Sequence, residues 1–242
     1  MANLTDLLKS FPGAQCRTLA KNKNTSEMLL AALSAHPDRH IRRLVATNQS
    51  TSIEVLKILM RDQEIIVRKG VAISQNVTID MLDELARDHD IVQAGVASNP
   101  NTTSEMFTLL SDSESLSVLM AIGKNPNAPG EILRNLISSN GIVREAVASN
   151  PKCPPDILSL LSREQDYEVQ QQVFQNERTP IVALLNFMND EDWRLNNAFL
   201  ESLIKQNPAY MLYVEMVEKA TINDYRDEIS LDLEVKSQLT EG

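Results

Sequence analysis

A five-residue stretch, VASNP, occurs at residues 96–100 and again at residues 147–151. The two copies are 51 residues apart, a distance that spans two shorter repeats. A period of about 25 residues predicts a solenoid, in which each repeat packs only on its neighbours. An eighth, degenerate copy is indicated by Leu195, Phe199 and Leu200. The anchor residue that closes each small-apolar stretch recurs in steps of 26, 26, 25, 26, 25 and 26 residues, at Asn22, Asn48, Ser74, Asn99, Asn125, Asn150 and Asn176.

Each repeat is predicted to contain two helices, and the first follows a helix-start signal. Thr51 with Glu54, and Thr102 with Glu105, have the spacing of a capping box. Three other repeats carry a proline that is predicted at the first helical position, at Pro129, Pro154 and Pro180. Paired apolar residues with a leucine one turn later predict a single apolar face for this helix. These residues are Val55, Leu56 and Leu59; Met81, Leu82 and Leu85; Ile132, Leu133 and Leu136; and Ile157, Leu158 and Leu161.

The second helix of each repeat is predicted to be short and to carry the main core positions. Its expected N-caps are Asp38, Asn140, Asp166 and Asp192. Small neighbours such as Gly70, Gly95 and Gly123 let adjacent helices approach closely. The anchor asparagine is predicted to end the helix in a left-handed conformation, and a following proline prevents its continuation. The expected core pairs are Ile41 and Val45, Val67 and Val71, Val92 and Val96, Val118 and Ile122, Val143 and Val147, and Val169 and Val173.

The sequence therefore predicts an all-α protein, an α-solenoid of about seven to eight two-helix repeats of 25–26 residues. We expect an N-terminal capping helix in residues 1–13, the repeat array in residues 14–202 and a C-terminal capping helix in residues 203–220. Residues 221–242 are expected to form an acidic tail.

Three stretches, VRKGVAIS, VQAGVASNPNTTSEMFTLL and VREAVASNPKCPPDILSLL, resemble the leucine-rich repeat variant family, which is similar in style to HEAT-repeat solenoids. The resemblance covers about residues 14–202. It implies a right-handed superhelix of paired helical segments without a β-sheet, and a binding scaffold more than any particular activity. The period of this chain is slightly longer than the usual repeat of the family. The iron–sulfur module known from the family needs clustered cysteines, and this sequence has only Cys16 and Cys153.

The charge of the chain is uneven. The net charge is −10, yet residues 1–100 carry 12 basic and 11 acidic residues, whereas residues 101–242 carry 11 and 22. This distribution argues against a nucleic-acid ligand along the whole molecule, because such proteins show a strong basic excess. It still permits a local basic face near the N-terminal end. The sequence has no apolar run long enough for a membrane span and no signal pattern, so we expect a cytoplasmic protein.

The sequence shows no catalytic constellation, and we expect no cofactor and no metal. Cys153 lies in the slot that Thr51 and Thr102 fill in other repeats, which indicates a structural role. The histidines His36, His40 and His89 lie at predicted turns, and paired acids recur once per repeat, as capping residues do. DNA-alkylation glycosylases are HEAT-like solenoids of similar length, but they need a basic channel with aromatic residues. Here the only tryptophan, Trp193, lies among acidic residues.

A ligand of a solenoid is expected on the face formed by the second helices. One row on these helices, Arg42, Arg68, Gln93, Arg144 and Gln170, is predicted to form a structural hydrogen-bond ladder, with acids such as Asp62 as partners. The next row points away from the core and changes from basic to acidic along the chain. It predicts a groove for a protein or peptide that is acidic at the N-terminal end of the array. The candidate contact residues are Arg17, Lys21, Arg43, Lys69, Met120, Lys124, Gln171 and Gln175.

Three functions remain open at this point. The first is a non-enzymatic scaffold that binds a protein or peptide along the second helices. The second is a nucleic-acid-binding or DNA-repair solenoid that uses Arg17, Arg43, Arg68 and Lys69. The third is a self-assembling structural protein, since the basic and acidic ends could join head to tail. Residues 229–235, ISLDLEV, alternate with the period of a strand, which indicates either an acidic tail or strand addition to another chain.

Overall fold

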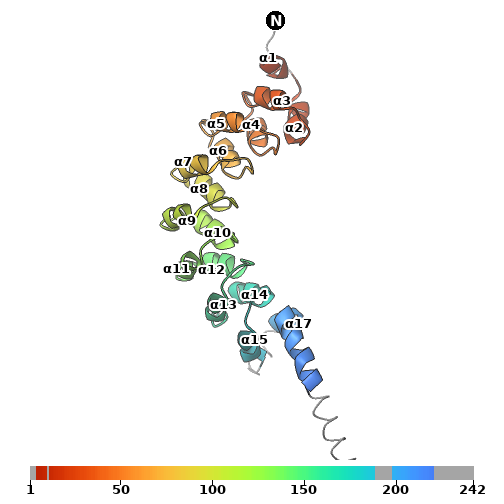
Figure 1. Ribbon diagram of the computed structural model, residues 1–242, viewed down its shortest axis with the longest axis vertical. Coiled ribbons are helices and arrows are strands. Elements are labelled where there is room, and N and C mark those ends of the chain that lie inside the picture. Colours follow the sequence, from red (N-terminus) through yellow and green to blue (C-terminus); the bar gives the residue numbers. More distant parts are fainter. Residues whose placement is uncertain (1–3, 10, 189–197, 221–242) are drawn as a thin grey trace, which may run out of the picture. The chain divides into compact units, whose positions relative to one another are not determined.

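The computed structural model of the protein describes residues 4–9, 11–188 and 198–220, and every regular element in these ranges is a helix (Figure 1). The chain divides into two compact units, Met1–Cys153 and Pro154–Gly242. The predicted strand at residues 229–235, the predicted N-cap Asp192 and Leu195 lie outside the described residues.

The helices of the first unit come in consecutive pairs. The first helices of the pairs are α1 (Leu4–Lys9), α3 (Glu27–Leu33), α5 (Ile53–Leu59), α7 (Ile79–Leu85), α9 (Ser104–Ser111) and α11 (Gly130–Leu136). The second helices are α2 (Gly13–Lys21), α4 (Arg39–Ala46), α6 (Ile65–Ala72), α8 (Asp90–Ala97), α10 (Leu116–Lys124) and α12 (Gly141–Ala148).

The second unit begins with one more pair, α13 (Pro155–Leu161) and α14 (Tyr167–Gln175). These are followed by α15 (Ile181–Met188) and α17 (Ala198–Gln206). Residues 208–220 are also helical, so helix covers most of the predicted C-terminal capping segment, with a break at Asn207. This break follows from the sequence QNP, because the helix stops at an asparagine–proline step like those of the earlier repeats.

The two layers of the first unit pack differently. Each second helix contacts the second helix of the next repeat along the series from α2 to α12. Figure 1 shows these helices on the inner side of the curved unit, with α5, α7, α9 and α11 on its outer side. The predicted core pairs are confirmed, since all their side chains, from Ile41 to Val173, are fully buried. The predicted apolar faces of the first helices are buried as well, which confirms the all-α repeat fold.

The helix starts differ from the prediction by one residue. Ser52 and Thr103, not Thr51 and Thr102, are the N-caps of α5 and α9. Thr51 is buried and its hydroxyl donates to the carbonyl oxygen of Val45 at 2.6 Å, six residues before it. Thr102 makes the same contact with Val96. These hydroxyls close the turn between the two helices of a repeat, so the predicted capping boxes at Thr51 and Thr102 are wrong.

The prolines show the same shift. Pro129 and Pro154 have extended backbone angles and stand at the N-cap, one residue before the predicted first helical position. The N-caps of the second helices are confirmed at Asp38, Asn140 and Asp166, each of which accepts a hydrogen bond from a backbone N–H of the first turn.

The anchor asparagines form a ladder between repeats, which we call the asparagine ladder. In Asn99, the side-chain nitrogen donates to the carbonyl oxygens of Ala72 at 2.7 Å and Ser74 at 3.1 Å, both in the preceding repeat. Its side-chain oxygen accepts the N–H of Asn101 at 2.9 Å. Asn48, Asn125, Asn150 and Asn207 donate to the preceding repeat in the same way.

This geometry corrects the predicted left-handed helix end. No described residue has a positive φ, and Asn125 and Asn176 are extended, with φ near −75°. The anchor is asparagine because its amide satisfies two carbonyls and one N–H at once. Ser74 is too short to donate to both carbonyls, and Asn76 instead donates to Gln49 at 2.8 Å and Thr51 at 2.9 Å in the preceding repeat.

Small residues set the spacing of the second helices. A Cβ atom added at Gly123 would lie 3.1 Å from the backbone nitrogen of Val147 and 3.2 Å from the Cβ of Ala146. This contact is tighter than packed interiors normally allow. A larger residue at position 123 would therefore require α10 and α12 to move apart.

Candidate functional site

The candidate contact residues fall on the second helices of both units. Arg17 and Lys21 lie on α2, Arg43 on α4, Lys69 on α6, and Met120 and Lys124 on α10. All are exposed except Met120, which is half-buried. Gln171 and Gln175 lie on α14, in the second unit. Ala94, at the corresponding position of α8, is buried.

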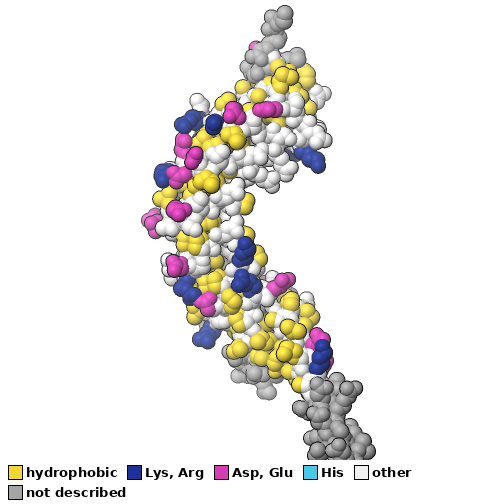
Figure 2. Space-filling model, viewed as in Figure 1, with side chains coloured by type: hydrophobic (Ala, Val, Ile, Leu, Met, Phe, Trp, Pro, Cys, Tyr) yellow, Lys and Arg dark blue, Asp and Glu magenta, His cyan; other side chains and the backbone are white. Residues whose placement is uncertain are grey.

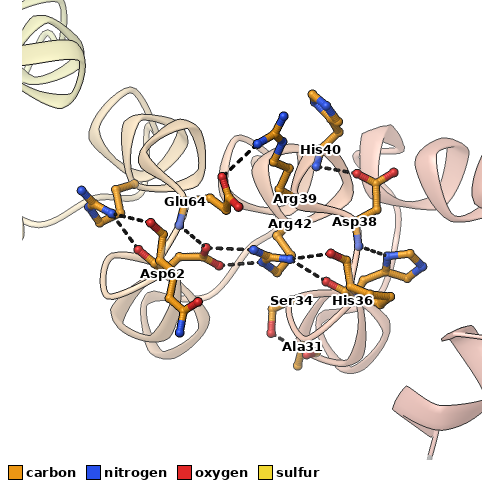
Figure 3. Close-up of polar contacts among 12 residues, drawn as sticks. Ala31, Ser34, His36, Asp38, Arg39, His40, Arg42, Asp62 and Glu64 are labelled. Carbon is orange, nitrogen blue, oxygen red and sulfur yellow. Dashed lines mark hydrogen bonds and ion pairs between the residues drawn. The ribbon is translucent and has the colours of Figure 1, made fainter. Parts of the chain in front are cut away.

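The neighbouring row makes structural hydrogen bonds, and the predicted ladder between repeats is confirmed for Arg42 and Arg68. Arg42 forms a two-pronged ion pair with Asp62 of the next repeat, with Nε–Oδ2 at 2.6 Å and Nη2–Oδ1 at 2.9 Å (Figure 3). It also donates to the carbonyl oxygens of His36 and Pro37. Arg68 repeats this arrangement with Asp88, at 2.6 and 2.8 Å. Gln93, Arg144 and Gln170 each donate to a carbonyl in the turn before their own helix.

The ion pairs shift the ionisation of their members. The hydrogen bond from Arg68 is the main cause that lowers the pKa of Asp88 below its usual range. Burial alone would raise the pKa of Asp62, but hydrogen bonds from Arg42 and the Glu64 backbone outweigh it, so that pKa is lowered too. Both carboxylates therefore stay charged at neutral pH. Their ion pairs hold the side chains of Arg42 and Arg68 in fixed positions. These two arginines are not available to a ligand.

We expect Arg68→Met to lower the free energy of unfolding by about 2 kcal/mol, because it leaves Asp88 without its cation in a half-buried site. The side chains of Arg68 and Asp88 are only 18% and 19% exposed. Arg61→Met is the matched control, since its ion pair with Glu84 is well exposed and should contribute less than about 0.5 kcal/mol. Urea denaturation followed by circular dichroism measures both. Equal effects of the two substitutions would contradict the structural role of Arg68.

His36 gives the first unit a dependence on pH. It is buried, and its Nδ1 accepts the backbone N–H of Asp38 at 3.0 Å. Burial is the main cause that lowers the pKa of His36; Asp38 opposes this shift and Arg42 adds to it. The unfolded chain therefore binds this proton more readily, and the stability contributed by neutral His36 is present above about pH 6.5 and lost as the pH falls through the folded pKa.

We expect His36→Asn, which keeps an acceptor oxygen for Asp38, to weaken this pH dependence. Unfolding midpoints in urea at pH 7.5, 6.5 and 5.5 should fall with pH in the wild type and change less in the variant. Identical pH profiles would show that His36 does not carry the effect.

Arg43 and Lys69, in contrast, make no ion pair within the described part of the chain, and both line a groove across α4, α6 and α8. The groove has a volume of about 360 Å³. Its other lining residues are His40, Ile66, Gly70, Ile73 and Ile91. We call these seven residues the second-helix groove.

The second-helix groove combines apolar and cationic surface. Ile73 and Ile91 are 41% and 40% exposed, so both present apolar surface to the groove beside the two cations. Arg43 and Lys69 were identified from the sequence as outward-facing residues, but Ile66 and Ile91 were not identified as part of the same surface. The available signal was their helical phase, because Ile66 and Ile91 directly precede the buried Val67 and Val92 and so lie beside the outward row.

The outer side of the first unit has a different character. Figure 2 shows basic and acidic side chains intermixed along the edge where α5, α7 and α9 lie. These charges pair with each other, as in Arg61 with Glu84 and Arg87 with Asp83. A face of paired charges has little net attraction for a ligand, so the second helices offer the stronger candidate surface.

Within residues 4–9, 11–188 and 198–220, no three His, Cys, Asp or Glu side chains gather as a metal site would require. Cys16 and Cys153 are both buried, and burial raises the pKa of the Cys16 thiol. None of the helices in this part of the chain combines the length and apolar character of a membrane span.

A search of solved structures matches this arrangement of helices. One match is described as "a leucine-rich repeat variant with a novel repetitive protein structural motif". It covers 81% of this chain and 84% of that chain, with a TM-score of 0.50 and 23% sequence identity. This chain has the leucine-rich repeat variant fold. No protein-family model and no curated protein matches the sequence.

The match confirms the resemblance that was inferred from VQAGVASNPNTTSEMFTLL and its sister stretches. At this level of identity it concerns the fold alone. The match therefore does not indicate a ligand for this chain, and the second-helix groove is the surface that does.

Proposed function

We propose that this protein is a non-enzymatic scaffold that binds a protein partner through an acidic and aliphatic peptide segment in the second-helix groove. The observation that carries the proposal is the juxtaposition of Arg43 and Lys69 with exposed isoleucines on the same three helices. We further propose that the binding occurs in the cytoplasm, as the sequence predicts.

The size of the groove supports a peptide as its ligand. A volume of about 360 Å³ is at the lower end of ligand pockets and accommodates a few side chains. Ile73 and Ile91 gain contact area when aliphatic side chains cover them, and this burial supplies affinity. Arg43 and Lys69 attract carboxylates over longer distances, which speeds association and gives it salt dependence.

The lining also supports binding over catalysis. His40 is its only imidazole, and the lining contains no serine, cysteine or carboxylate side chain that could act with it as a nucleophile or acid. The remaining contacts available are apolar surface and fixed positive charge, which recognise a ligand without transforming it.

Peptide display on the full-length protein tests this proposal. A random library panned against the wild type should enrich sequences that alternate aliphatic residues with Asp or Glu. Arg43→Glu/Lys69→Glu should lose these sequences, because it reverses the charge of the groove. Arg61→Glu/Arg87→Glu changes the net charge equally on the outer side and should retain them. Enrichment of basic peptides, or of peptides that share no sequence pattern, would overturn the proposal. Binding of the acidic and aliphatic peptides by the groove variant would also overturn it.

A further inference from the structure

The second-helix groove sets requirements on any occupant. Its floor offers Ile66, Ile73 and Ile91, and its cations are Arg43 and Lys69. The occupant must therefore present aliphatic side chains and carboxylates close together on one short segment.

The C-terminal part of this chain contains such a segment. Residues 229–235, ISLDLEV, alternate four aliphatic residues with Ser230, Asp232 and Glu234. The surrounding residues 221–242 carry six acidic and two basic residues, a net charge of −4. The segment thus complements the groove both in apolar character and in charge.

The lengths also agree. Seven residues in an extended conformation span about 23 Å. Helices that pack directly lie 8–10 Å apart, so the three axes of α4, α6 and α8 span about 16–20 Å. An extended segment of this length crosses all three helices that line the second-helix groove. Its aliphatic side chains then face the isoleucines, and Asp232 and Glu234 lie on the opposite face, where the long side chains of Arg43 and Lys69 must extend past the edge of the segment to meet them.

We propose that residues 229–235 of one copy of this protein bind the second-helix groove of a second copy. The proposal rests on the proposed function, because it takes the groove to be a peptide site. The bound segment competes with any external peptide for Arg43, Lys69 and the three isoleucines. An external partner must then displace the segment of the second copy before it binds.

Disulfide trapping in the full-length protein tests this contact. Leu233→Cys is combined with Ile73→Cys in the groove, or with Ile58→Cys on the outer side of α5 as the matched control. Both host sites are exposed isoleucines, and the two native cysteines are buried. In a glutathione redox buffer, the Ile73→Cys pair should cross-link at least about tenfold faster than the Ile58→Cys pair, because docking raises the local thiol concentration.

Charge variants of the same pairs show whether the contact is specific. Asp232→Lys/Glu234→Lys should slow the trapping at Ile73→Cys, and adding Arg43→Glu/Lys69→Glu should restore it by exchanging the charges. A faster cross-link between two copies at Ile73→Cys supports the proposal. A cross-link confined to one chain, or equal rates at Ile73→Cys and Ile58→Cys, would overturn it. Peptide display would still enrich acidic and aliphatic sequences in that case if the proposed function holds, so the two failures are distinguishable.

Discussion

We expect Asn99→Ala to lower the free energy of unfolding by about 3 kcal/mol, the largest effect of any single side-chain truncation proposed here. Asn99 is 1% exposed and makes three hydrogen bonds, to Ala72, Ser74 and Asn101. The truncation leaves two carbonyls and one N–H without these partners. A buried polar group without a partner costs more than the net value of its hydrogen bond.

Two further variants distinguish the stability lost with the hydrogen bonds of Asn99 from the stability lost with the volume of its side chain. Asn99→Asp keeps the shape but places an oxygen against two carbonyl oxygens, so it should destabilise at least as much as alanine. Asn101→Ala is the control, because the Asn101 side chain is exposed and its backbone N–H remains. Urea denaturation at neutral pH measures all three. A loss below about 0.5 kcal/mol for Asn99→Ala would contradict the role of the asparagine ladder.

The second large effect is expected for Gly123→Leu, which should lower the free energy of unfolding by about 3 kcal/mol. The new Cβ would meet the backbone of α12 at Val147 and Ala146, which cannot rotate away as a side chain can. Helices α10 and α12 must then separate. Because a repeat contacts mainly its neighbours, the loss should concentrate around these two helices.

Hydrogen exchange measures this local effect, with faster exchange expected in α10 and α12 than in α4. Gly13→Leu is the matched control, because no atom lies within 4 Å of a Cβ added there. An unchanged unfolding midpoint for Gly123→Leu would show that the second helices do not need this close approach.

Much of the fold follows from local sequence. The step of 25–26 residues fixes the repeat, and the valines before each VASNP-like cassette fix the buried face of the second helix. The ion pair of Arg42 with Asp62 was also predictable. Arg42 lies between two apolar stripes of its helix, and acidic residues such as Asp62 recur in the turns. These features depend on residues that are close in the chain or repeat with its period.

The errors share a physical cause. The role of Asn99 depends on carbonyls 25 and 27 residues earlier, and helix-end preferences contain no information about such a distant partner. Thr51 could equally cap a helix or close a turn, and only the burial of its hydroxyl decides. The candidate site was predicted in part, because Arg43 and Lys69 are exposed cations in an outward row. The contribution of Ile66 and Ile91 to the site was not predicted, since an isoleucine in a helix is ordinarily assigned to the core.

The most direct measurement is a pull-down from native lysate with three full-length proteins, followed by mass spectrometry and nucleic-acid staining. The three are the wild type, Arg43→Glu/Lys69→Glu in the second-helix groove, and Arg61→Glu/Arg87→Glu on the outer side. The account predicts that the wild type and the outer variant retain a protein partner that the groove variant loses. Retention of the same proteins by all three, or loss of nucleic acid and not protein from the groove variant, would contradict it.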